Sequence, residues 1–99
     1  MEYEIKFHLD ALKEFCKLDG SIKILVKKQL DKLKKSPLIG EELGNKNGYD
    51  LSGYRKMYVC KKQIRIVYSV VENILLVNII AIGKREDMEV YETAAKRRN

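Results

Sequence analysis

The chain has 99 residues and a formal net charge of +6, from 20 lysines and arginines against 14 acidic residues. That length allows one domain with a thin core, and we assign residues 1–99 to it. The apolar runs are far shorter than the roughly 20 residues of a transmembrane helix. The acidic start at Glu2 and Glu4 does not resemble a signal peptide, so we expect a cytoplasmic protein without membrane association.

Residues with metal or nucleophile chemistry are few. Cys16 and Cys60 have neither metal-ligand spacing nor a disulfide framework, so we expect two reduced, buried thiols. His8 is the single histidine, and a lone histidine beside an apolar run is more often structural than functional. The sequence has no phosphate-binding glycine loop, zinc spacing or aspartate cluster, so it predicts neither a metal nor a cofactor.

The N-terminal part predicts a strand and a short helix. Residues 3–9 alternate between apolar and polar, which is typical of a half-buried strand. Asp10 is the expected helix cap, and Gly20 the expected residue just past the helix end. The inner stripe of this helix is predicted to contain Leu12, Phe15 and Cys16.

A second helix is predicted from Ile22 to Lys35. Ser21 is its expected N-cap, and Ser36 followed by Pro37 ends it. Its apolar residues recur at helical spacing: Ile22, Val26, Leu30 and Leu33. The lysines lie mostly off that stripe, which favours a solvated face over direct RNA contact, although both interpretations remain open.

The remaining chain predicts a loop, a strand meander and a helix. Residues 38–50 are expected to form a loop, with a turn at Asn47 and Gly48. Tightly joined, antiparallel strands follow at 54–60, 63–71 and 74–82. The last of them is apolar on both faces, which indicates a central position in the sheet. A terminal helix from residue 87 or 88 to Arg98 has Val90, Ala94 and Tyr91 on its inner stripe.

These elements predict an α+β fold. The N-terminal strand, an αα-hairpin, and a three-stranded antiparallel meander completing one sheet are followed by a short C-terminal helix. The helices would gather on one face of the sheet. The opposite face would then be open to solvent or a ligand.

Two basic stretches are candidates for the functional site. Residues 54–65 hold five basic residues, two tyrosines and no acid, and residues 83–91 bring Lys84, Arg85 and Tyr91 together after a buried strand. Cations interleaved with aromatics are typical of single-stranded RNA recognition. Edge lysines that discourage aggregation and half-buried strand tyrosines are the structural alternative.

A nuclease built from these residues would work without metal. The ribose 2′-hydroxyl of RNA supplies the nucleophile, and the protein supplies positioning, cations for the phosphate and groups that move protons. Lysine becomes a useful base when neighbouring cations lower its pKa.

The sequence resembles the RelE/ParE superfamily of type II toxins, and within it the RelE-like branch. The resemblance covers nearly the whole chain in order and spacing. It rests on Ala11 to Phe15 followed by Lys17 and Leu18, the lysine-rich segment ending at Ser36 and Pro37, Ile64 to Tyr68, Gly83 to Glu86, and Glu89 to Tyr91. It implies a ribosome-dependent mRNA interferase that cuts in the A site through a 2′,3′-cyclic phosphate. The implied partners are a cognate antitoxin, the ribosome and mRNA.

The resemblance also implies roles for individual residues. Arg65 matches a phosphate-stabilising arginine, Arg85 an arginine that stabilises or protonates the leaving group, and Tyr91 a tyrosine that stacks on a base. Lys56 matches the first of two strand lysines that bind phosphate or act as base. The second falls on Tyr58, which leaves the general base open, with Lys56 favoured. Further RNA contacts are expected from Tyr58, Lys61, Lys62 and Lys84.

Two alternatives remain at this point. A gyrase inhibitor of the ParE type shares the fold, so fold alone does not decide. ParE-type members usually lack the full cationic set and the terminal tyrosine, which argues against that alternative. A toxin fold that has lost catalysis but still binds its antitoxin is the other alternative, and Tyr58 in place of lysine is its main support.

Overall fold

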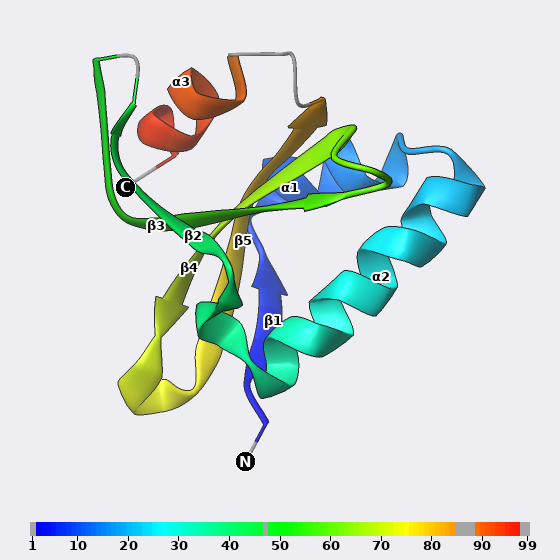
Figure 1. The fold of residues 1–99 in the computed structure, drawn as a ribbon, viewed down its shortest axis with the longest axis horizontal. Helices are drawn as coiled ribbons and strands as arrows, with labels where there is room; N and C mark the ends of the chain where they lie inside the picture. The colour runs from blue at the N-terminus through cyan, green and yellow to red at the C-terminus, as the bar shows by residue number, and fades with distance from the viewer. Residues whose placement is uncertain (1, 47, 85–88, 98–99) are drawn as a thin grey trace.

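The computed structural model describes residues 2–46, 48–84 and 89–97, which form a five-stranded sheet with helices on both faces (Figure 1). The strand order is β1-β5-β4-β3-β2. In chain order the elements are β1 (Glu4–Phe7), α1 (Leu9–Cys16), α2 (Gly20–Lys35), η1 (Pro37–Ile39), β2 (Glu41–Lys46), β3 (Tyr49–Val59), β4 (Ile64–Val71), η2 (Glu72–Ile74), β5 (Leu76–Lys84) and α3 (Glu89–Lys96). The predicted α+β class, with its N-terminal strand, αα-hairpin, meander and terminal helix, is confirmed.

The apolar strand β5 lies inside the sheet, as its composition predicts. It pairs in parallel with β1 on one side and antiparallel with β4 on the other. The strand begins at Leu76 rather than at residue 74, because η2 forms the connection and leaves Ile74 62% exposed. The sheet is therefore mixed, since the β1–β5 pair is parallel and the other three pairs are antiparallel.

Helices α1 and α2 cover one face of the sheet. The predicted stripe of α2 is confirmed, because Val26, Leu30 and Leu33 are buried against strand residues. The predicted stripe of α1 is wrong in part, since Leu12 is 42% exposed and Cys16 is also exposed. Ala11 lies in the core with Phe15 packed against it, four residues apart on one helix face. Cys60 is half-buried, so neither thiol is fully buried as expected.

The helix caps differ from those predicted. His8 caps α1, with Nδ1 accepting from the Asp10 amide at 3.1 Å, so Asp10 lies inside the helix. Asp19 occupies the N-cap position of α2, and Gly20 and Ser21 are helical residues. The Ser21 hydroxyl donates to Asp19 at 2.6 Å. The connection between the helices is too short to hold a separate glycine terminator and a new cap.

Strand β2 lies where a loop was predicted. Residues 41–46 pair antiparallel with β3, which itself begins at Tyr49 rather than at residue 54. Local composition hides this strand, because it contains Gly44 and Asn45 and is interrupted by a bulge between Glu42 and Gly44. Gly44 has a φ of 61° at the bulge, and Gly48 has a φ of 80° in the turn that follows. Asn47 lies outside the described residues.

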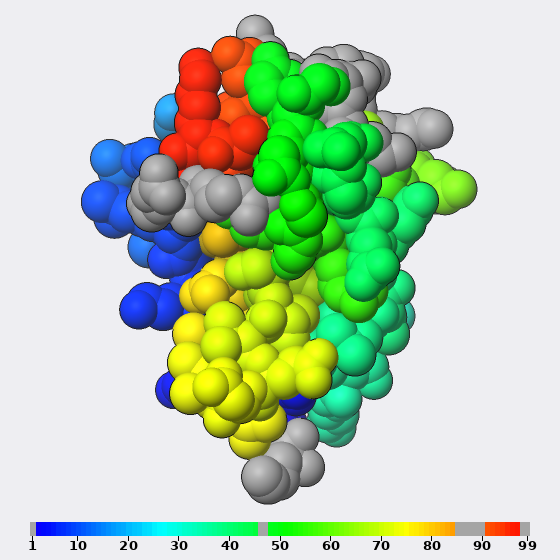
Figure 2. Space-filling model, turned by 90° about the vertical axis from the view of Figure 1, so that its left-hand side faces the viewer, coloured from blue at the N-terminus to red at the C-terminus, as the bar shows by residue number. Residues whose placement is uncertain are grey.

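The second face of the sheet is covered too, contrary to the prediction that it is open. Helix α3 packs on β3 and β5, and Figure 2 shows it (red) beside the β2–β3 hairpin (green). A second core cluster fills this face: Leu43, Leu51, Tyr54, Val67, Ile80, Ala81, Tyr91 and Ala94. Within the described part of the chain, no helix is long and apolar enough to cross a membrane.

Candidate functional site

Four of the predicted site residues lie on the α3 face of the sheet. Strand β3 supplies Lys56 and Tyr58, and β4 supplies Arg65, whose Cα pairs with that of Tyr58 across the ladder. Met57 and Val59 point into the opposite core, so the predicted alternation along β3 is confirmed. Tyr91 reaches the group from α3. We call Lys56, Tyr58, Arg65 and Tyr91 the cationic cluster.

Arg65 is buried at the centre of the cationic cluster. It is 5% exposed, and its guanidinium carbon lies 4.5 Å from the ring centroid of Tyr91 and 5.6 Å from that of Tyr58. Both distances permit cation–π attraction. Its Nε and Nη1 atoms are buried, and neither has a hydrogen-bond partner among the described residues. A buried donor without a partner costs about 1–3 kcal/mol, so Arg65 is placed to receive an anionic acceptor.

Lys56 and Tyr58 form a hydrogen-bonded pair at the edge of the cationic cluster. Lys56 Nζ donates to Tyr58 Oη at 3.1 Å and lies 3.5 Å from a carboxylate oxygen of Glu41 on β2. Burial lowers the pKa of Lys56, but the hydrogen bond to Tyr58 and the charges of Tyr91, Tyr58 and Glu41 outweigh it and raise that pKa above its ordinary value. The prediction that crowded cations lower a lysine pKa is therefore wrong for Lys56.

The phenol of Tyr58 responds in the opposite direction. The hydrogen bond from Lys56 lowers the pKa of Tyr58 below its ordinary value. Burial opposes this change, and a hydrogen bond with Arg65 together with the two positive charges reinforces it. The cluster thus favours a protonated lysine and eases ionisation of the tyrosine beside it.

Helix α3 is held in place by an ion pair that joins distant parts of the sequence. Arg97 donates to both carboxylate oxygens of Glu14 on α1, at 2.9 and 3.0 Å, and to the Ile80 carbonyl at 2.8 Å. The Ile82 amide donates to Glu14 at 3.1 Å. The pair therefore provides hydrogen-bond partners for two backbone groups of β5 that lie beyond the end of its pairing with β1. Tyr91, only 3% exposed, is consequently held with its ring over Arg65.

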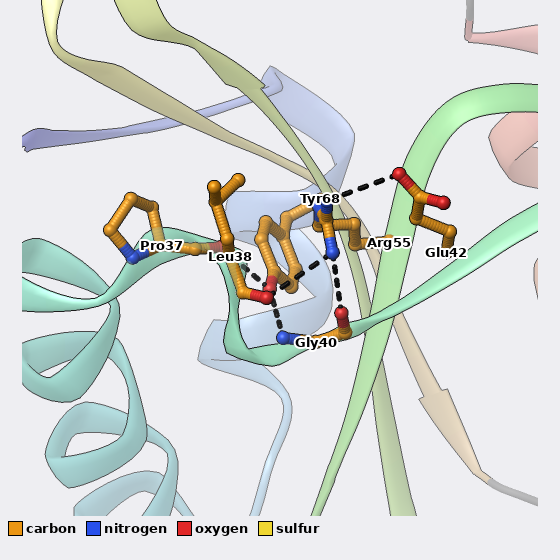
Figure 3. A network of polar contacts seen from close by, with 6 residues as sticks. All are labelled: Pro37, Leu38, Gly40, Glu42, Arg55 and Tyr68. Atoms are coloured by element: carbon orange, nitrogen blue, oxygen red, sulfur yellow. Dashed lines mark hydrogen bonds and ion pairs between the residues drawn. The ribbon is translucent and has the colours of Figure 1, made fainter.

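A polar network around Tyr68 and Arg55 fixes the start of β2 (Figure 3). The Tyr68 hydroxyl donates to the Pro37 carbonyl at 2.9 Å and accepts from the Gly40 amide at 2.8 Å. Arg55 donates to the Gly40 carbonyl at 2.8 Å and to Glu42 at 3.2 Å. These contacts determine where β2 begins and so bring Glu41 to Lys56. Sequence reasoning missed Glu41, Glu14 and Arg97, because nothing local relates residues that meet only across the fold.

The other predicted RNA-binding residues lie outside the cationic cluster. Lys61 and Lys62 are exposed in the turn after β3, with φ angles of 54° and 68°. Three successive left-handed residues, beginning at Cys60, concentrate backbone strain beside the site. Lys84 pairs with Ile64, a residue of the core under α1 and α2, so the structure does not bring Lys84 to Arg65. Arg85 lies outside the described residues.

Comparisons with known proteins agree with this fold and identify the family. No family model matches the sequence. The "mRNA interferase toxin RelE" of Escherichia coli K12 is 37% identical over 98% of both chains. Two solved structures are similar: a double-arginine mutant of E. coli toxin RelE in the free state (TM-score 0.82, 32% identity, 100% of both chains), and the E. coli RelBE toxin–antitoxin complex (TM-score 0.69, 30% identity, 86% of this chain and 99% of that one). This chain therefore belongs to the RelE-like branch of the RelE/ParE toxins.

Proposed function

We propose that this toxin is a ribosome-dependent endoribonuclease that cleaves mRNA in the A site without a metal. The 2′-hydroxyl would attack the adjacent phosphorus and leave a 2′,3′-cyclic phosphate. The observation that carries the proposal is Arg65, a buried cation between two tyrosine rings, two of whose donors find no partner among the residues that the structure describes. A phosphodiester supplies both the charge and the acceptor oxygens that such a group lacks.

The cationic cluster divides the work among its members. Arg65 stabilises the charge that builds on the phosphate, and Lys56 adds a second, permanently protonated cation, in keeping with its raised pKa. Tyr91 orients Arg65 through its ring, and because that ring is 3% exposed here, it stacks on a base only after RNA entry has exposed it. Arg85, outside the described residues, is proposed to stabilise the negative charge on the leaving 5′ oxygen. Lys61 and Lys62 meet the RNA backbone.

A cognate antitoxin is the proposed protein partner, alongside the ribosome and mRNA. The support is the similarity to E. coli RelE, which is solved in an intact complex with its antitoxin. Large apolar side chains are exposed on the described surface of α1 and α2, among them Leu9, Ile24 and Leu25. Apolar surface of this kind is typical of sites that a partner covers. We place this toxin and its partners in the cytoplasm.

The test is cleavage on programmed ribosomes with a defined A-site codon, with mRNA ends mapped by primer extension. Wild type is compared with Arg65→Ala and Tyr91→Ala, and Lys28→Ala on the remote face of α2 serves as control. A single A-site cut that requires ribosomes and falls at least about 100-fold in Arg65→Ala supports the proposal.

Two other results would contradict the proposed nuclease activity. Absence of cleavage combined with toxicity in cells and trapped gyrase cleavage complexes would indicate a gyrase inhibitor. Absence of both cleavage and toxicity would indicate a toxin fold that only binds its antitoxin.

A further inference from the structure

The proposed cleavage requires a group that takes the proton of the 2′-hydroxyl. Lys56 is poorly suited to that task. Burial favours its neutral form, yet the hydrogen bond to Tyr58 and the neighbouring charges outweigh burial and raise the pKa of Lys56. A lysine that keeps its proton more firmly than usual serves as a cation rather than as a base.

Tyr58 occupies the place between the two cations of the cluster. Its hydroxyl accepts a hydrogen bond from Lys56 at 3.1 Å, and the guanidinium carbon of Arg65 lies 5.6 Å from its ring centroid. Arg65 and Tyr91 are buried, whereas Lys56 and Tyr58 are half-buried. Tyr58 therefore lies on the more exposed side of the cluster, next to the two groups that would hold the phosphate.

We infer that Tyr58 is the proton acceptor of the cleavage reaction, an inference that rests on the proposed function. The phenolate oxygen of Tyr58 takes the 2′-hydroxyl proton while the 2′ oxygen bonds to phosphorus. The bond from phosphorus to the 5′ oxygen breaks, and that oxygen keeps the electron pair and is protonated by water. Tyr58 then returns its proton to solvent, which restores the phenolate.

The charges that face Tyr58 from each neighbouring element support this role. Lys56 of β3 and Arg65 of β4 stabilise a phenolate, and both contribute to the lowered pKa of Tyr58. Tyr91 of α3 meets the cluster as a ring over Arg65. The carboxylate of Glu41 on β2 is 67% exposed and engages Lys56 at 3.5 Å. Glu41 is the rival acceptor, and its variant belongs in the test.

The experiment is single-turnover mRNA cleavage on saturating programmed ribosomes, measured across the pH range in which ribosomes stay intact. Wild type is compared with Tyr58→Phe, Glu41→Gln and the control Tyr49→Phe, the same chemical change at the start of β3. A further variant carries 3,5-difluorotyrosine at position 58, which keeps the shape and hydroxyl but ionises more readily. Circular dichroism melts verify that each variant is folded.

The expected result is a loss of about 100-fold or more in Tyr58→Phe, a much smaller loss in Glu41→Gln, which weakens only the contact to Lys56, and little change in the control Tyr49→Phe. Wild-type cleavage should rise with pH, and difluorotyrosine should move that rise to lower pH. If wild type cleaves but folded Tyr58→Phe cleaves equally fast, Tyr58 is not the acceptor and the proposed function stands. If Glu41→Gln alone loses activity, the carboxylate is the acceptor. If wild type does not cleave at all, the proposed function and this inference fall together.

Discussion

Arg65 illustrates how the site tolerates a buried charge at the scale of one residue. Two tyrosine rings flank its guanidinium, and a desolvated cation–π contact contributes about 2 kcal/mol. No carboxylate among the described residues pairs with it. The protein therefore stabilises the cation with ring faces and leaves donors available for an anion, an arrangement suited to binding rather than to stability.

The tyrosines are expected to ionise in a defined order. Tyr58 should ionise early, since the hydrogen bond from Lys56 lowers its pKa, and Tyr68 late, since burial raises its pKa. Absorbance of tyrosinate against pH should lose its earliest rise in Tyr58→Phe and its latest rise in Tyr68→Phe. Identical curves for both variants would contradict the assignment.

The sign of the Tyr68 effect on stability follows from the same shift. Its folded pKa lies above its unfolded pKa, so folding favours the neutral phenol. That contribution to the free energy of unfolding is complete below the unfolded pKa and is lost as pH rises through the folded pKa. Urea unfolding of wild type should therefore show lower stability at strongly alkaline pH than at neutral pH.

Gly40 is required by a close approach rather than by an unusual φ angle. A Cβ atom there would collide with the Tyr68 hydroxyl and lie 2.8 Å from the Lys56 carbonyl oxygen. Gly40→Ala should lower the free energy of unfolding by about 1–3 kcal/mol, as overpacking does. Gly20→Ala is the matched control, since a Cβ at Gly20 meets nothing within 4 Å. Equal midpoints for the two variants in urea unfolding would show that the Gly40 contact relaxes freely.

At the scale of elements, the site depends on β2 and α3, one at the edge of the sheet and one across its face. The contacts of Gly40 with Tyr68 and Arg55 fix the start of β2 at the edge of β3. Strand β2 in turn carries Glu41, whose carboxylate lies beside Lys56. Helix α3 carries the ring that covers Arg65. Neither element contains enough apolar residues to be stable alone, so tertiary contacts hold both.

The Glu14–Arg97 ion pair is expected to control the position of α3. Arg97→Ala removes a charged pair whose side chains are 13% and 31% exposed, and the loss should be about 1.5–3 kcal/mol. Hydrogen exchange in α3 should accelerate, and cleavage should fall because Tyr91 is no longer held over Arg65. Lys96→Ala is the control, because the Lys96–Glu92 pair is exposed and contributes at most about 0.5 kcal/mol. An equal effect of the two variants would contradict a positioning role.

At the scale of the whole molecule, two exposed lysine pairs lie on different elements. One pair, Lys61 and Lys62, is in the turn between β3 and β4. The other pair, Lys27 and Lys28, is exposed on the outer surface of α2. The net charge of +6 attracts polyanions to the whole protein, whereas the proposed RNA contacts involve only the charges beside the cationic cluster.

The two lysine pairs provide a matched comparison. Replacing Lys61 and Lys62 by glutamine should weaken cleavage at sub-saturating protein and reduce its salt dependence, by roughly 0.7 in the logarithmic slope per lost phosphate contact. Replacing Lys27 and Lys28 in the same way should change both quantities little. Cleavage measured over a series of salt concentrations distinguishes the pairs, and a larger effect from the α2 pair would place RNA contacts on that helix instead.

The sequence alone determined the features that follow from local pattern. Helical spacing predicted the buried face of α2, a strand apolar on both faces predicted the inner position of β5, and alternation predicted that Lys56 and Tyr58 share a face. Each of these depends only on the period of a helix or a strand. The resemblance to the RelE-like toxins could also be recognised from the sequence, because its motifs lie within short segments.

Only the tertiary structure decided what depends on distance through space. Strand β2 has weak local propensity and exists because it pairs with β3. The Glu14–Arg97 pair joins residues 83 positions apart, and α3 closes a face that the local pattern leaves open. The direction of the Lys56 pKa shift also depends on the fold. It is set by burial and by Tyr58 on the same strand, Tyr91 on α3 and Glu41 on β2, which the fold brings together. Electrostatics and pairing act through space, and the order of residues along the chain does not contain those distances.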